Sequence, residues 1–160
     1  MPKVFIAADH AGFALKNALL ERVRGQGHKV EDLGAFTFDA EDDYPDIMTP
    51  LAHKVFEEEA FGIMIGGSGQ GEAMCANRVT GVRAAVFYGP VRASAEIERE
   101  GGVSEDAFDI VRLARRHNGA NVLSIGARFV SENDAAEAVR IFLETPFSDV
   151  PRHSRRLAKF

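Results

Sequence analysis

Short apolar runs alternate with amphipathic stretches along the whole chain. Five of these runs have the length and the nearly continuous apolar character of strands that are buried on both faces of a sheet. The five runs are residues 3–8, 29–33, 62–65, 82–87 and 121–125. Alternation of this kind predicts a parallel sheet with helices on both faces and right-handed crossovers. We therefore expect an α/β protein with a three-layer, Rossmann-like fold and a five-stranded parallel sheet.

The stretches between and after these runs predict six helices. They are residues 11–24, 45–59, 72–78, 104–118, 131–144 and a basic C-terminal tail, 151–160. Pro45 suits the first position of the second helix, and Ser104 and Ser131 suit N-caps because acidic residues follow each of them. Residues 93–100 are ambiguous and could form a further helix.

The composition narrows the class of protein. With 160 residues, of which 46% are apolar, the chain is long enough for a single domain, 1–160, with a substantial core. A net charge of -5 and a pI near 5.5 argue against a general nucleic-acid binder. The single cysteine excludes an internal disulfide, and no apolar run is long enough for a signal peptide or a membrane span. We expect a soluble cytoplasmic protein without nucleic-acid or membrane partners.

The stretch 62–78 holds the strongest chemical signal. It joins a buried strand to a helix through four glycines, Gly66, Gly67, Gly69 and Gly71, with Ser68 and Gln70 between them. Such a turn brings backbone N–H groups close to a ligand and favours an anion, while Glu72 adds a carboxylate at the rim. The spacing matches neither a P-loop nor a dinucleotide fingerprint. The alternative interpretation is a tight strand-to-helix connection with no ligand.

The residues that follow predicted strands should converge at one edge of the sheet, where parallel sheets bind ligands; they are Asp9-His10, the glycine loop, the segment after the fourth strand and Arg128. Asp9 and His10 directly follow the first strand, although Asp9 could merely cap a helix. Other candidates lie at a helix end or in the tail. His117 ends a helix beside two arginines and could be a surface residue that complements the helix dipole. The basic tail could clamp a phosphate or form a solvated helix face. We interpret the acidic cluster in 39–43 as solvated, because its spacing matches no calcium loop, and Cys75 as a packed thiol.

An ordered set of motifs resembles the ribose-5-phosphate isomerase B family, which includes galactose-6-phosphate and allose-6-phosphate isomerases. The match covers nearly the whole chain. The motifs are Ala8-Asp9-His10-Ala11-Gly12, Asp43-Tyr44-Pro45, Gly66-Gly67-Ser68-Gly69-Gln70-Gly71-Glu72, Ala76-Asn77-Arg78, Arg116-His117-Asn118, Ile125-Gly126-Ala127-Arg128 and Arg152-His153-x-x-Arg156. One branch of the family has a catalytic cysteine directly after the third strand. Here Gly66 holds that position, and Glu72 stands where the other branch has its base.

The resemblance implies a cofactor-free and metal-free aldose–ketose isomerisation of a sugar phosphate through a cis-enediolate. It implies catalytic roles for Glu72 as the base, for Ser68 at the developing oxyanion, and for His117 and Asp9 in ring opening. It also implies a substrate-binding set, namely His10, Tyr44, Gly67, Gly69, Gly71, Asn118, Arg128, Arg152, His153 and Arg156. Family members are dimers or tetramers that share their sites, so we expect a homodimer or homotetramer in which some of these groups come from a neighbour.

Ribose 5-phosphate and ribulose 5-phosphate are the expected pair. The alternatives are isomerisation of another tetrose or hexose phosphate, or a sugar-phosphate-binding module without catalysis. Enclosure would raise the pKa of Glu72 and a helix N-terminus would lower it, and the sequence leaves the outcome open. The chain also departs from the family by an insertion near residues 90–103, which could cover the sugar end of the pocket and shift substrate choice, or be a surface elaboration.

Overall fold

The chain folds around a five-stranded sheet in which all neighbouring strands are parallel. A computed structural model describes residues 3–97 and 103–159. The strands are β1 (Val4–Ala8), β2 (Val30–Asp32), β3 (Phe61–Gly66), β4 (Ala84–Phe87) and β5 (Val122–Gly126). Their order across the sheet is β2-β1-β3-β5-β4. The predicted α/β, Rossmann-like fold with a five-stranded parallel sheet is confirmed.

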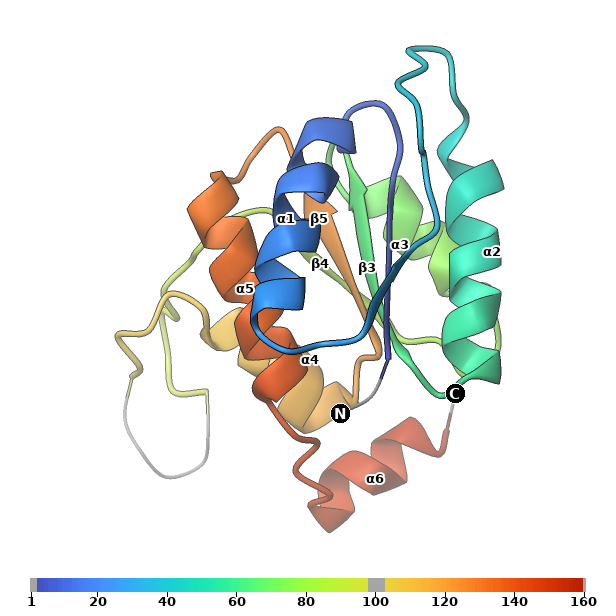
Figure 1. Cartoon of the computed structure of the whole chain (residues 1–160). Coiled ribbons are helices and arrows are strands. Elements are labelled where there is room, and N and C mark those ends of the chain that lie inside the picture. Colours follow the sequence, from blue (N-terminus) through green and yellow to red (C-terminus); the bar gives the residue numbers. More distant parts are fainter. Residues whose placement is uncertain (1–2, 98–102, 160) are drawn as a thin grey trace.

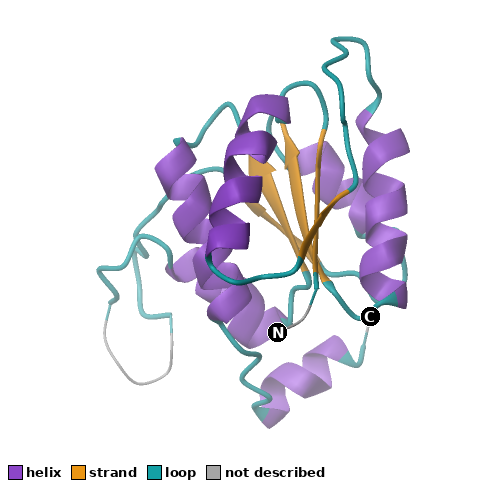
Figure 2. Ribbon diagram, viewed as in Figure 1, coloured by secondary structure: helices purple, strands orange, loops and turns teal. Residues whose placement is uncertain are grey.

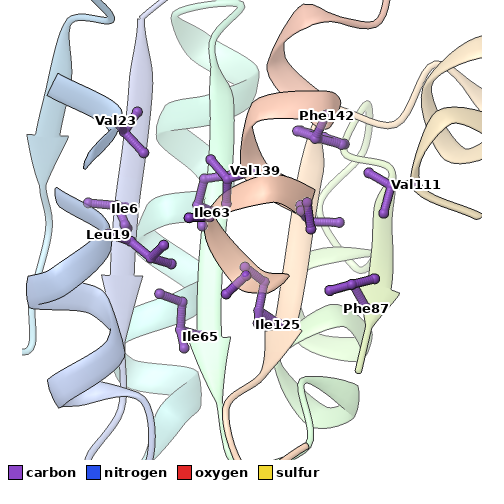
Figure 3. Packing of buried hydrophobic residues seen from close by; sticks show 14 of the residues in the cluster. Ile6, Leu19, Val23, Ile63, Ile65, Phe87, Val111, Ile125, Val139 and Phe142 are labelled. Carbon is purple, nitrogen blue, oxygen red and sulfur yellow. The ribbon is translucent and has the colours of Figure 1, made fainter. Parts of the chain in front are cut away.

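Helices cover both faces of the sheet, as Figures 1 and 2 show. They are α1 (Phe13–Gly25), α2 (Tyr44–Glu57), α3 (Gln70–Ala76), α4 (Asp109–Asn118), α5 (Glu132–Glu144) and α6 (Pro151–Leu157). Side chains of β3 alternate between the two faces: Ile63 and Ile65 join the core beneath α1, α4 and α5, and Met64 joins the core beneath α2 and α3. Figure 3 shows Ile63 beside Val139 of α5 and Ile65 beside Leu19 of α1. The sheet is therefore buried on both faces, which explains its continuous apolar runs.

Two predictions about the segment before α4 need correction. The helix expected from Ser104 begins at Asp109. Its start is delayed because the Ser104 hydroxyl accepts from the N–H of Asp106 (3.2 Å) and the Asp106 carboxylate accepts from the N–H of Phe108 (2.8 Å), so local turns compete with the helix. Residues 93–97 are not helical, and the rest of the ambiguous stretch 93–100 lies outside the described residues.

The two ends of the sheet carry different groups of predicted site residues. At one end, β1 is followed by Asp9, β3 by the glycine loop, and β5 by the segment that contains Arg128. The other end, where the strands begin, lies beside the C-terminus of α4 and beside α6 (Figure 1). None of the helices in the described parts of the chain has the length and apolar character needed to cross a membrane.

Candidate active site

A cavity of about 360 Å³ lies at the C-terminal edge of the sheet. It is lined by side chains or backbone from the ends of β1, β3 and β5 and from the first turns of α2 and α3. Eight of the predicted site residues line it, namely Asp9, His10, Tyr44, Gly67, Ser68, Gly71, Glu72 and Arg128, together with Ala11 and Phe129. The convergence follows from topology, because the carboxyl ends of parallel strands meet at one edge.

The glycine loop is fastened to β5. Gly69 has a φ of +75°, in the left-handed region that favours glycine, and it caps the N-terminus of α3. Its carbonyl accepts a hydrogen bond from the buried Ser124 hydroxyl at 2.6 Å. Within the loop, the Ser68 hydroxyl accepts from the N–H of Gln70 at 3.3 Å. These contacts give the loop one conformation at the wall of the cavity, with the Ser68 hydroxyl among the lining groups.

The Glu72 carboxyl group occupies the space that a side chain at position 66 would need. A Cβ added to Gly66 would lie 2.8 Å from Oε2 of Glu72 and closer still to Oε1 and Cδ. Gly66 ends β3, and Glu72 lies in the first turn of α3, so its carboxyl group reaches back to the end of the strand. A side chain at position 66 and the observed Glu72 conformation therefore exclude each other.

Glu72 is only 4% exposed, and burial raises the pKa of its carboxyl group. A hydrogen bond from its own backbone N–H lowers the pKa, while the charge of Asp9 and a side-chain hydrogen bond with Asp9 raise it. Asp9 accepts the N–H groups of Ala11 (2.9 Å) and Gly12 (3.2 Å) through Oδ1. These two N–H donors hold the Asp9 carboxyl group in place beside Glu72.

Tyr44 and Arg128 form the walls on either side of the glycine loop. The ring of Tyr44 lies so close to Gly71 that an added Cβ would be 2.7 Å from Cζ and 2.8 Å from the hydroxyl oxygen. Arg128 is exposed, its guanidinium lies above Gly67, and its backbone N–H donates to the Gly67 carbonyl at 3.2 Å. Glycine at 67 and 71 therefore lets an aromatic ring and a cation approach the loop closely.

His10 pairs with a carboxylate from the acidic loop. Its Nδ1 lies 2.6 Å from Oδ1 of Asp42, and its backbone N–H donates to the same oxygen at 3.2 Å. The hydrogen bond to Asp42 raises the pKa of the His10 imidazole. The expectation that the acidic cluster is merely solvated is therefore wrong for Asp42, whose side chain is 12% exposed.

Gly69 lies in the glycine loop, and the other predicted residues lie at the opposite end of the sheet. His117 and Asn118 end α4, just before β5 begins, and Arg152, His153 and Arg156 belong to α6. The rings of His117 and His153 have centroids 4.1 Å apart. Within one chain, this second group does not join the cavity at the C-terminal edge.

A serine that sequence reasoning missed supports these two histidines. The Ser148 hydroxyl lies 2.6 Å from the carbonyl of Arg116 and 2.9 Å from Nδ1 of His153. Since a hydroxyl has one proton, which the carbonyl must receive, the oxygen accepts from an Nδ1–H of His153. His153 is only 3% exposed, so it is a packed group beside His117 in this chain rather than a solvent-facing one.

Ser124 and Asp42 were also missed, and only one of them left a signal in the sequence. Ser124 is a polar residue inside a buried apolar run, which is a position that requires a hydrogen-bond partner. Asp42 stands among several acidic residues, and nothing in its spacing distinguishes it from Glu41 or Asp43. Its contact with His10, 32 positions away, depends on tertiary structure alone.

Known proteins resemble this chain along almost its whole length. Residues 4–101 and 103–160 match the family model described as "Ribose/Galactose Isomerase". A ribose-5-phosphate isomerase B of Mycolicibacterium paratuberculosis is 36% identical over 97% of this chain and 87% of its own length. A probable ribose-5-phosphate isomerase B of Mycoplasma genitalium is 39% identical over 98% of this chain and 91% of its own.

Solved structures show the same relation. The crystal structure of ribose-5-phosphate isomerase B from Mycoplasma genitalium with bound ribulose-5-phosphate has a TM-score of 0.84 and 36% identity, covering 98% of this chain and 92% of that one. The type B enzyme of Trypanosoma brucei has a TM-score of 0.84 and 33% identity, covering 99% and 96%. With a family match along almost its full length and relatives above 30% identity, the chain belongs to the ribose-5-phosphate isomerase B family.

Proposed function

We propose that this protein interconverts ribose 5-phosphate and ribulose 5-phosphate through a cis-enediolate, with Glu72 as the base. The observation that carries the proposal is the buried Glu72 carboxyl group, whose pKa is raised by burial and by Asp9, at the wall of a cavity with room for a small sugar. The relatives are named as ribose-5-phosphate isomerases, and one related structure holds ribulose-5-phosphate.

The reaction requires one group to take a proton and return it. The Glu72 carboxylate removes the proton from C2 of the open-chain aldose, and the electron pair of that C–H bond forms the C1–C2 double bond of the enediolate. The protonated carboxyl then delivers the proton to C1, while the proton on O2 moves to O1 and the carbonyl forms at C2. A base with a raised pKa suits both steps, because it is a stronger base when ionised and holds its proton until the return.

The oxyanion needs stabilisation as it develops. In our proposal the Ser68 hydroxyl and the N–H groups of Gly69 and Gly71 take this role, with Gly67 leaving room for the sugar. The fixed conformation of the loop supports it, because donors that need no rearrangement stabilise a developing charge most effectively. Tyr44 lines the sugar site in this arrangement.

Phosphate binding and ring opening require both groups of predicted residues. His10 and Arg128 bring positive charge to the cavity within one chain. Arg152, His153 and Arg156 as phosphate ligands, and His117 and Asn118 in ring opening with Asp9, would have to come from a second copy of the chain, because they lie at the other end of the sheet. We therefore propose a homodimer or homotetramer with shared sites.

A panel of sugar phosphates tests the reaction. Wild-type protein is expected to isomerise ribose 5-phosphate with a higher kcat/KM than tetrose or hexose phosphates, and the Glu72→Gln variant is expected to lose about 10²- to 10⁴-fold in kcat. Preference for another sugar phosphate would support the alternative substrate class. Binding without turnover by wild type would support a non-catalytic module.

Mixing inactive variants tests the shared site. Glu72→Gln and His117→Asn would damage different halves of each site, so a heterodimer would keep one intact site. Subunit exchange between them should restore about a quarter of wild-type activity. The matched control mixes Glu72→Gln with Asp9→Asn, which damage the same half and should restore nothing. Equal recovery in both mixtures would argue against sharing.

A further inference from the structure

Asp42 makes a two-point contact with His10. One carboxylate oxygen, Oδ1, accepts the backbone N–H of His10 at 3.2 Å and lies 2.6 Å from the ring nitrogen Nδ1. The same oxygen therefore fixes the backbone and the ring of one residue. Because the carboxylate has only acceptors, a hydrogen bond of this length requires a proton on Nδ1.

The other oxygen of Asp42 is unusual. Oδ2 is buried and has no hydrogen-bond partner among the residues that the structure describes. A buried carboxylate oxygen without a donor disfavours the folded state. The contact that Oδ1 makes is therefore poorly explained by stability alone, and a role toward His10 explains it better.

The loop that carries Asp42 is anchored near its start. The ammonium of Lys16, which is 1% exposed, donates to the carbonyl of Ala35 at 2.7 Å and to both carboxylate oxygens of Asp32 at 2.8 and 2.7 Å. A buried cation held by three acceptors fixes the entry to the loop. The exit is fixed by α2, which begins at Tyr44, so Asp42 sits between two anchored points.

We propose that Asp42 is a positioning residue for His10, holding the imidazole as a cation whose Nε2–H serves as a donor to the substrate phosphate in the cavity. The phosphate contact rests on the proposed function, whereas the orientation and charge of the ring do not. Without Asp42 an imidazole of ordinary pKa, near 6.5, is mostly neutral at pH 7.5 and loses most of its value as a phosphate donor.

The charges around His10 act in both directions. Asp42 and Asp9 favour the cation, and Arg128 opposes it. Glu72 and Tyr44 line the same cavity. The Asp42 hydrogen bond is the largest of the influences on the pKa of His10, and burial acts against it. Removing the Asp42 charge should therefore return the pKa of His10 to its ordinary value or below it, because burial and then Arg128 still lower it, against Asp9 alone.

The test combines an NMR titration with kinetics on Asp42→Asn. Asparagine keeps the size and the acceptor oxygen but removes the charge. In wild type, the titration of the His10 ring should give a pKa above about 6.5, with Nδ1 protonated throughout. In Asp42→Asn the pKa should fall to that value or lower. At pH 8 the KM for ribose 5-phosphate should rise by up to about tenfold with little change in kcat, and at pH 6 the two proteins should have similar KM values.

The matched control is Glu41→Gln. Glu41 is exposed, is adjacent in the same loop, and undergoes the same change of charge. It should leave both the His10 pKa and the KM profile unchanged. Wild-type His10 with an ordinary pKa, an unchanged His10 pKa in Asp42→Asn, or an equal KM shift in both variants would overturn the proposal. The wild-type titration remains decisive if Asp42→Asn does not fold, and a protein that lacks isomerase activity but shows the predicted titration would contradict only the proposed function.

Discussion

The Glu72 carboxyl group occupies the space that a side chain at position 66 would need, so the substitution Gly66→Ala should displace it. Gly66 is not in the left-handed region, so alanine is compatible with its backbone, and the obstacle is the side chain of Glu72. With Cβ 2.8 Å from Oε2 and closer to Oε1 and Cδ, the carboxyl group must move by an ångström or so. A displacement of that size at a reacting group reduces kcat by about 10²-fold, equivalent to about 2.7 kcal/mol in the activation barrier.

A double-mutant cycle separates this clash from other effects of the methyl group. Gly66→Ala alone should lower the free energy of unfolding by about 1–3 kcal/mol, because Glu72 is buried and its movement disturbs a packed site. In the Glu72→Ala background the same substitution should have almost no effect on stability, since the competing carboxyl group is absent. Steady-state kinetics and urea unfolding measure the two quantities. A Gly66→Ala enzyme with wild-type kcat, or additive stability changes in the cycle, would refute the assigned position of the Glu72 carboxyl group.

Three further predictions concern stability, support of the histidines, and the insertion. The pKa of Glu72 is higher in the folded protein than in the unfolded chain, so as the pH rises above about 4.3 the unfolded chain loses this proton first and the folded state loses stability. Glu72→Gln should therefore melt at the wild-type temperature or higher at pH 7.5, and the difference should shrink toward pH 4. A variant that melts at a lower temperature than wild type at pH 7.5 would contradict this. Ser148→Ala should lower the melting temperature by several degrees and reduce kcat/KM, because it removes the hydroxyl that contacts the buried Nδ1 of His153 and the carbonyl of Arg116. Ser148→Thr keeps the hydroxyl and should have a smaller effect on both quantities. Shortening the segment near 90–103 should change the ratio of kcat/KM between five-carbon and six-carbon phosphates if the segment covers the sugar, and unchanged ratios would assign it to surface elaboration.

The sheet and one half of the site could be predicted from sequence because both depend on local order along the chain. Strands buried on both faces leave continuous apolar runs, and parallel strands bring the residues that follow them to one edge. Asp9, the glycine loop and Arg128 therefore converged as expected. The structure places His117 at the other end of the sheet, where it lies in the last turn of α4 just before β5.

What could not be predicted depends on contacts between distant segments or on competition between local structures. The hydrogen bond between Asp42 and His10 joins the acidic loop to the end of β1, and no pattern in the sequence predicts this contact. α4 starts late because the side chains of Ser104 and Asp106 accept hydrogen bonds from backbone N–H groups two residues further on. In the sequence, residues that form such turns look the same as residues that cap a helix. The direction of the Glu72 pKa shift could be inferred only once the burial of its side chain was known, and the sequence alone does not show that burial.

The exchange of the C2 proton with solvent tests the central role of Glu72 most directly. When ribose 5-phosphate is incubated with the enzyme in D₂O, proton NMR reports the loss of the C2 proton separately from product release. Wild type should exchange this proton during turnover, and Glu72→Gln, with its fold intact and its phosphate affinity retained, should exchange it about 10²- to 10⁴-fold more slowly. Exchange by Glu72→Gln at the wild-type rate would show that another group removes the proton.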